Sequence, residues 1–147
     1  MQLNAALMCL RSLHTASYLT VSYDYVNKWL YADWQEQQSP ATVQAGSELL
    51  LQCLKDKECH KLLTDNTRVL GSLTAASEWV KLNLFQQLAD IGVAYIAWVH
   101  SSNCYSRYTA DFILQQVDSP IVAAFNDLPA AYAWLQHCDT YRCLNAS

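Results

Sequence analysis

The segment that most constrains the fold is residues 93–99, which read Val-Ala-Tyr-Ile-Ala-Trp-Val and include no charged side chain. A continuous apolar run rich in β-forming residues is typical of a strand that is covered on both faces. Strands of this kind belong to parallel sheets with helices packed on each side. We therefore expect an α/β protein, with this strand at the centre of its sheet.

The remaining elements alternate in the order that such a sheet requires. Residues 18–24 have the two-residue period of a half-buried strand and pair with an aromatic-rich strand, residues 29–34, in a β-hairpin. Right-handed crossovers then give a mixed, mostly parallel five-stranded sheet flanked by four helices, in the order ββαβαβαβα. The later strands are predicted at 61–65, 93–99 and 121–125, and the helices at 42–57, 74–90, 105–117 and after a cap at Asn126 and Asp127.

The 147 residues are predicted to form one domain. We place a single α/β domain at residues 18–138, an N-terminal extension that could hold one short element at 1–17, and a flexible C-terminal tail at 139–147. Hydrophobic residues make up 52% of the chain and charged residues 15%. This composition predicts a well-filled core and leaves some apolar surface for self-association.

Charge and hydropathy exclude several classes of function. The net charge is -4 and the nine basic residues are scattered, which argues against binding to nucleic acid or to anionic membranes. Charged and amide residues interrupt every candidate membrane-spanning stretch, and residues 1–13 lack the features of a signal peptide. We expect a cytoplasmic protein with six reduced cysteines.

The sequence gives little support for a metal site or a cofactor site. Cys59-His60 and His137-Cys138 fall at predicted helix ends and could form a mixed zinc site, but no tight Cys-x-x-Cys pair is present. We interpret them as buried or capping side chains and expect no metal. The chain's three glycines form no phosphate-binding loop, so we expect no nucleotide cofactor.

Several short stretches resemble the bacterial SpoIIAA-like family, whose members are described as STAS/SEC14 domain proteins. The resemblance covers about residues 18–136 and implies a regulatory or ligand-binding module without an enzymatic role. It depends on 29–34 (Trp-Leu-Tyr-Ala-Asp-Trp), Asp65-Asn66, 78–80 (Glu-Trp-Val), 97–99 (Ala-Trp-Val), Ser106-Arg107 and 131–135 (Ala-Tyr-Ala-Trp-Leu).

A possible phosphorylation site also follows from this resemblance. Related anti-sigma factor antagonists carry a phosphorylatable serine after the third strand, in an Asp-Ser-Ser-Gly-like turn. Here residues 65–72 read Asp-Asn-Thr-Arg-Val-Leu-Gly-Ser, so the loop is longer and the motif is missing. Thr67 and Ser72 are the candidate positions. The helix dipole and Arg68 would favour a phosphate at Ser72, which could instead be only a helix cap.

A polar rim is predicted where the parallel strands end, because ligands of α/β sheets usually bind there. Simpler roles remain open: turn-forming bonds for the Asp and Asn residues, and an exposed ion pair between Arg107 and Asp111. His100 with Ser101 or Ser102 has the residue types of a hydrolase, but no nucleophile elbow is present, and we expect no enzyme. The candidate ligand-binding residues are Asp65, Asn66, Thr67, Arg68, His100, Ser101, Arg107 and Asn126.

Aromatic and aliphatic side chains beside the core stripes form a second candidate surface. These side chains widen the apolar faces of two predicted helices beyond what one face of the sheet should cover. They are Trp79, Leu82 and Phe85 on the second helix and Trp134 on the fourth. They form either an exposed partner surface or part of the hydrophobic core. Our leading hypothesis is a non-enzymatic STAS-like regulatory or protein-interaction module that forms a homodimer through these two helices. The alternative is a small-molecule or lipid carrier with its pocket at the carboxyl ends of the strands.

Overall fold

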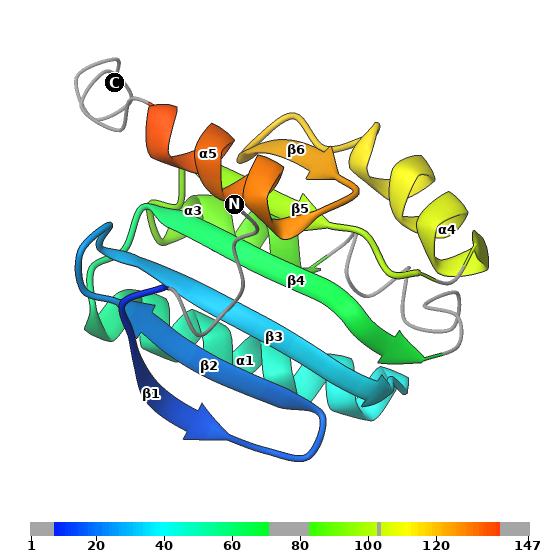
Figure 1. The fold of residues 1–147 in the computed structure, drawn as a ribbon, viewed down its shortest axis with the longest axis horizontal. Coiled ribbons are helices and arrows are strands. Elements are labelled where there is room, and N and C mark those ends of the chain that lie inside the picture. The colour runs from blue at the N-terminus through cyan, green and yellow to red at the C-terminus, as the bar shows by residue number, and fades with distance from the viewer. Residues whose placement is uncertain (1–7, 71–82, 103, 139–147) are drawn as a thin grey trace.

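A six-stranded sheet runs through the molecule, in the spatial order β1-β2-β3-β4-β5-β6 (Figure 1). The computed structural model describes residues 8–70, 83–102 and 104–138. Strands β1 to β3 pair antiparallel, and β3 to β6 pair parallel. The strands are β1 (Leu10–Thr15), β2 (Leu19–Asp24), β3 (Trp29–Gln37), β4 (Lys61–Leu70), β5 (Tyr95–Val99) and β6 (Ile121–Phe125).

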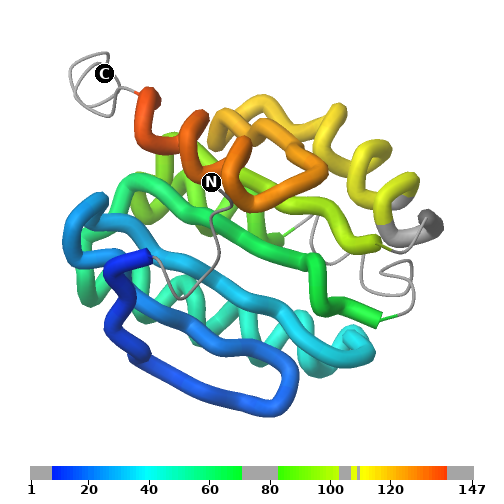
Figure 2. Tube along the Cα trace, viewed as in Figure 1, coloured from blue at the N-terminus to red at the C-terminus, as the bar shows by residue number. Residues whose placement is uncertain are grey.

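Helices cover the two faces of the sheet unequally. The helices within the described residues are α1 (Pro40–Asp56), α3 (Phe85–Asp90), α4 (Cys104–Leu114) and α5 (Leu128–His137). The crossover helices α1, α3 and α4 pack on one face, which we call the α1 face. On the opposite face, which we call the α5 face, α5 is the only helix of the described residues, and it packs over β4, β5 and β6 (Figures 1 and 2).

The alternation of side chains along β3 shows how the two cores are built. Leu30, Ala32 and Trp34 point into the larger core on the α1 face. Trp29 and Tyr31 point into the smaller core on the α5 face, together with Leu135 of α5. A single strand therefore contributes to both cores, because its successive side chains point to opposite sides of the sheet.

The predicted α/β class with a mixed sheet is confirmed, with three corrections. The sheet has six strands rather than five, because β1 forms within the segment that we had assigned to an N-terminal extension. Strand β4 continues to Leu70, through residues predicted as a loop. Strand β5 is fifth in the sheet and not central. Its apolar sequence reflects cover on both faces, which any strand between helix layers can have.

Single residues account for three local features of the fold. A Cβ atom built on Gly46 of α1 would lie 2.6 Å from the ring of Trp34, so the helix backbone approaches the sheet closely there. Gly92 follows α3 with a φ of +98°, a conformation that commonly ends a helix. Asp127 caps α5 by accepting a hydrogen bond from the amide of Ala130 at 2.8 Å.

No helix in the described part of the chain has the length and apolar character that crossing a membrane requires.

Candidate ligand-binding site

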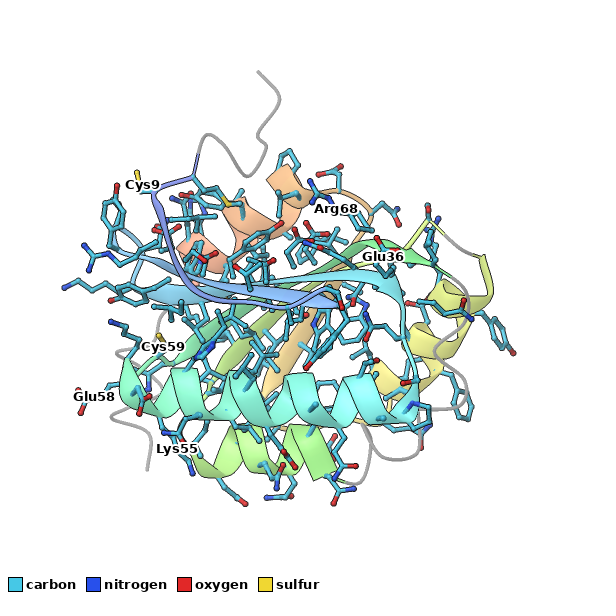
Figure 3. The ribbon with its side chains drawn as sticks, turned by 90° about the horizontal axis from the view of Figure 1, so that it is seen from below. Cys9, Glu36, Lys55, Glu58, Cys59 and Arg68 are labelled. Carbon is cyan, nitrogen blue, oxygen red and sulfur yellow. The ribbon has the colours of Figure 1, made fainter. Side chains whose placement is uncertain are left out.

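An apolar cavity of about 60 Å³ lies between the α1 face of the sheet and helices α1, α3 and α4. Figure 3 shows the layer that contains it, with α1 and α3 on one side of the sheet. Most of the cavity lining is aliphatic or aromatic, as in small-molecule sites generally. The lining residues are Trp34, Gln38, Val43, Ser47, Leu50, Leu62, Thr64, Asn66, Leu84, Phe85, Leu88, Ile96, Trp98, Ala110, Ile113 and Leu114.

Hydrogen bonds within the protein hold several of the polar groups around this cavity. The indole Nε1 of Trp34 donates to Thr64 Oγ1 at 3.1 Å, which joins β3 to β4 on the α1 face. Asn66 donates through Nδ2 to the carbonyl oxygen of Val99 at 3.1 Å. Gln38 donates to the carbonyl oxygen of Gln35 at 2.7 Å. These bonds fix side chains at the cavity wall and use up donors that a ligand would otherwise meet.

Two other residues of the lining carry a buried polar group that makes no hydrogen bond. The hydroxyl of Ser47, on α1, and the indole Nε1 of Trp98, on β5, are buried and have no hydrogen-bond partner. Ser47 is 0% exposed. Buried polar groups in proteins are nearly always paired, so these two are exceptions.

A polar cluster occupies the α5 face, where β3 and β4 run side by side. Tyr31 donates its hydroxyl to Asp65 Oδ2 at 2.6 Å, and the amide of Thr67 donates to Asp65 Oδ1 at 3.0 Å. Asp33 is the register neighbour of Asp65 on β3, and Arg68 Nη1 lies 3.4 Å from its Oδ2. In Figure 3, Arg68 lies on the α5 side of the sheet.

Burial determines the protonation of this cluster. It raises the pKa of the Asp33 carboxyl, an effect that Gln35 and Arg68 oppose and that neighbouring Asp65 reinforces. The other oxygen of Asp33, Oδ1, is buried without a hydrogen-bond partner. Burial and the Asp65 carboxylate also raise the pKa of Tyr31, so its phenol stays protonated and acts as a donor.

The rest of the predicted rim forms separate pairs. His100 Nε2 lies 3.0 Å from Asp111 Oδ1, and burial lowers the pKa of His100, with Asp111 acting against this shift. Ser101 Oγ donates to the carbonyl oxygen of Val69 at 3.2 Å. Arg107 Nη2 donates to Asn126 Oδ1 at 2.6 Å. The ion pair considered between Arg107 and Asp111 does not form, because Asp111 contacts His100 and Arg107 contacts Asn126.

The eight predicted ligand-binding residues do not converge on one site. Asp65 and Asn66 lie within β4, where consecutive side chains point to opposite faces. Asp65 joins the α5-face cluster with Arg68, while Asn66 reaches the cavity on the α1 face. Thr67, a candidate for phosphorylation, is exposed on β4, and Ser72 lies outside the described residues.

The structure describes two of the four residues of the predicted aromatic partner surface, Phe85 and Trp134. Phe85 is 3% exposed and lines the cavity, so it belongs to the core. Trp134 is half-buried, with its ring centroid 5.7 Å from that of Phe125 and 6.1 Å from that of Tyr95. Trp79 and Leu82 lie outside the described residues.

The cysteine and histidine pairs make local contacts. His60 Nδ1 lies 2.9 Å from the carbonyl oxygen of Gly92, and His137 Nδ1 lies 2.7 Å from that of Ala133. Cys59 is buried, and Cys138 Sγ donates to the carbonyl oxygen of Trp134 at 3.4 Å. In the part of the chain that the structure describes, no three metal-binding side chains come together.

Sequence reasoning missed the residues that distinguish the cavity. Ser47 stands four residues after Val43 on the apolar side of α1, and a polar residue at such a position is the signal that could have identified it. Trp98 was interpreted only as part of an apolar strand. Its unpaired indole nitrogen depends on neighbours from other elements, which the sequence does not place.

Comparison with known proteins gives a likeness of fold. No protein-family model matches the chain, and no curated protein matches it. Among solved structures, the chain is similar to an uncharacterized protein of the DUF3478 family with a SpoIIAA-like fold, from Shewanella loihica PV-4. The sequence identity is 17% and the TM-score 0.49, over 86% of this chain and 91% of that chain.

Proposed function

We propose that this domain is a non-enzymatic binding module that takes up a small apolar molecule, or an apolar group of a larger one, in the cavity on the α1 face. The observation that supports the proposal is the cavity itself, bordered by the sheet and three helices and lined mainly by apolar side chains. Protein interiors are normally packed almost without voids of this size. The site lies under the sheet face rather than at the strand ends, where we expected a carrier's pocket.

The size of the cavity limits what it can hold. Its volume of about 60 Å³ exceeds the roughly 10–15 Å³ that one water molecule needs. It is far below the roughly 300–1,000 Å³ of pockets for drug-sized ligands. We therefore favour a compact ligand over a whole lipid molecule.

Xenon is the first probe, because apolar cavities accept it without needing hydrogen bonds. Under xenon pressure, methyl resonances of Leu50, Ile96 and Ile113 should shift in NMR spectra of the wild-type protein. Ala110 is buried at the cavity wall, so Ala110→Leu should fill the space and remove the shifts. Ala133→Leu makes the same change at an exposed position of α5 and should leave them unchanged.

Native mass spectrometry of the freshly purified protein addresses the natural ligand. We expect a co-purified small compound that is lost from Ala110→Leu and retained by Ala133→Leu. Wild-type methyl resonances that do not respond to xenon would count against the proposal, as would a bound compound that both variants retain equally.

A second candidate, a regulatory protein-interaction module that forms a homodimer, is favoured by a separate observation on α4. Tyr108 and Phe112 lie one helical turn apart and are 77% and 62% exposed. Neighbouring exposed aromatic side chains are typical of partner surfaces. This proposal places the contact on α4 instead of on the two helices that we first expected.

Sedimentation over a range of concentrations tests this second proposal. Tyr108→Ser with Phe112→Ser should weaken self-association. The matched control is Tyr25→Ser with Val26→Ser, which removes two other exposed side chains, in the β2–β3 turn, and should have no effect. A wild-type protein that stays monomeric at the highest concentration would rule out the homodimer.

A further inference from the structure

We infer that the outer edge of β6 pairs with β6 of a second copy of this chain, in antiparallel orientation, so that the two sheets join into one. β6 is the last strand of the sheet, and among the described strands only β5 pairs with it (Figure 1). This inference does not depend on the cavity. It shares with the second candidate function the need for a homodimer, but it places the contact on a strand edge rather than on the exposed side of α4.

The two edge strands of the sheet differ in how well they are protected from pairing. β1, at the opposite edge, carries Arg11 and has a bulge between Ser12 and His14. Charged side chains and bulges are common means by which proteins block pairing at a sheet edge. β6 reads Ile-Val-Ala-Ala-Phe, without a charged residue, and it pairs with β5 without a bulge. None of its residues, all of which the structure describes, is buried.

Hydrogen bonds to the β5 segment show which backbone groups of β6 face outward. The N–H group of Ile121 and the C=O group of Phe125 both bond to backbone groups that flank β5, each at 2.9 Å. The N–H and C=O groups of one strand residue point to the same side, and those of the next residue point to the other. Val122 and Ala124 therefore present their backbone groups to the outside.

An antiparallel pair centred on Ala123 uses all of these outward groups. Val122 then stands opposite Ala124 of the second copy, and the two residues exchange both of their N–H···O=C bonds. The two-fold symmetry of the pair repeats this exchange with the roles reversed. Ala123 meets its own copy at the axis, in the close position without hydrogen bonds, where a small side chain fits.

Side chains are compatible in this register, although the contact is short. Ile121, which is 51% exposed, stands opposite Phe125 of the second copy. Pairs of β-branched and aromatic side chains stabilise neighbouring strands. Stable protein interfaces bury far more surface than one short strand edge provides, so we expect a weak dimer that forms at high concentration.

Opposite charges also meet at the ends of the paired strands. Arg107 Nη2 donates to Asn126 Oδ1 at 2.6 Å, so the guanidinium group lies at the carboxyl end of β6. In the antiparallel register this end lies beside the amino end of β6 in the second copy, which Asp118 precedes. Both Arg107 and Asp118 are exposed, while Asp127, which follows the strand, already caps α5. Charge complementarity therefore favours a second copy over an unrelated strand.

Cysteine cross-linking tests the register. Two Cα atoms that meet at the axis should be about 4.5 Å apart, which is within the range that a disulfide spans. Ala123→Cys should therefore form a disulfide between copies under mild oxidation, and peptide mass spectrometry identifies the linked positions. Ser12→Cys, on the opposite edge strand, is the matched control and should not link to its own copy.

Sedimentation from micromolar to millimolar concentration tests the hydrogen bonds. Ala124→Pro removes an outward N–H group and leaves the bonds to β5 intact, because proline is tolerated where a strand N–H points away from the sheet. It should weaken self-association by about tenfold. Ala124→Ser keeps the N–H group at the same position and should associate like the wild type.

The outcomes separate this inference from the other proposals. A dimer in which Ala123→Cys does not cross-link, or which Ala124→Pro leaves intact, would overturn the inference. Tyr108→Ser with Phe112→Ser should not prevent the cross-link, and its loss in that variant would assign the contact to α4 instead. A wild-type protein that stays monomeric at millimolar concentration would overturn both this inference and the second candidate function. Binding of xenon in the cavity is independent of all these results.

Discussion

Tyr31 links β3 to β4 through a single short hydrogen bond to a buried carboxylate. Its hydroxyl donates to Asp65 Oδ2 at 2.6 Å, and both side chains are buried. Hydrogen bonds to charged groups are stronger than neutral ones, and a buried carboxylate oxygen that loses its donor is costly. The phenol therefore stabilises Asp65 as well as filling space in the core.

Tyr31→Phe should lower the free energy of unfolding by about 2 kcal/mol, because Asp65 loses this donor in a buried position. Urea denaturation at neutral pH measures the change. Tyr108→Phe removes the same hydroxyl from an exposed position on α4 and should change stability by less than about 0.5 kcal/mol. A similar loss in the two variants would contradict the assigned role of the bond.

Asp33 is a buried carboxyl with few interactions that would favour its ionised form. Its side chain is buried beside another carboxylate, and one of its oxygens has no hydrogen-bond partner. Its ion-pair partner Arg68 is 67% exposed, which makes the pair weak. Burial therefore raises the pKa of Asp33, and the ionised form is disfavoured in the folded protein.

Asp33→Asn should become more favourable relative to wild type as the pH rises. A carboxyl whose pKa is raised on folding contributes stability below its unfolded pKa of 3.8, and this contribution is lost as the pH rises through the higher folded value. Asparagine does not ionise, so the difference in unfolding free energy should grow over this window and then level off.

Urea denaturation of both proteins between about pH 3 and pH 8 measures this difference. Asp118→Asn makes the same substitution at an exposed position before β6 and is the control. If the Asp33→Asn difference is constant with pH, then burial does not perturb Asp33 in the way that its surroundings indicate.

At the scale of whole elements, the contact between α1 and the sheet depends on Gly46. The built Cβ atom at this position lies 2.6 Å from Trp34 Cη2, closer than real Cβ atoms approach, and 3.0 Å from Leu19 Cδ2, which is a tight contact. Alanine is otherwise preferred to glycine in a helix by about 1 kcal/mol. The close packing of helix on sheet outweighs that preference here.

Gly46→Ala should therefore destabilise the protein by about 1–2 kcal/mol, because overpacking of a core costs more than the gain in helix propensity. The substitution should also push the Trp34 ring toward the cavity that it lines and so weaken xenon binding. Urea denaturation and the xenon experiment measure the two effects.

A double-mutant cycle with Trp34→Phe provides the control, since phenylalanine lacks the distal ring atoms that the new methyl group meets. Gly46→Ala should cost less in the Trp34→Phe background than in the wild type. An equal cost in both backgrounds would mean that the ring is not the obstacle.

At the scale of the whole molecule, the larger core encloses two thiols that only extensive opening can expose. Cys53 and Cys59 are buried in the core of the α1 face. Burial raises the pKa of Cys59 to about 11. Alkylating reagents react with the thiolate, so both burial and protonation protect this residue.

Iodoacetamide at about pH 8 should modify Cys9 rapidly and Cys59 slowly in the native protein, with the Cys59 rate rising steeply in urea. Peptide mass spectrometry distinguishes the two sites within one sample, and Cys9, which is exposed, is the internal control. Equal rates without denaturant would show that the α1-face core opens far more readily than its burial indicates.

More of the fold than of the candidate site could be predicted from the sequence. Alternation in residues 18–24 and the apolar run at 93–99 are local patterns, and they correctly predicted a hairpin followed by strands and helices. The extension of β4 to Leu70 was missed, because Asn66, Thr67 and Arg68 have the composition of a turn. Pairing with β3, which continues as far as Gln37 and Leu70, provides the ladder that overrides this preference.

The amino-acid sequence by itself determined the α/β class and the cap of α5 at Asp127, because each depends on residues close together along the chain. Only the tertiary structure decided that Asp65 and Asn66 serve opposite faces, that Asp111 pairs with His100, and that Ser47 and Trp98 border one cavity. Hydrogen-bond partners and cavities depend on which distant segments pack together. For this reason the predicted rim separated into pairs, and the proposed binding site lies elsewhere, beneath the sheet.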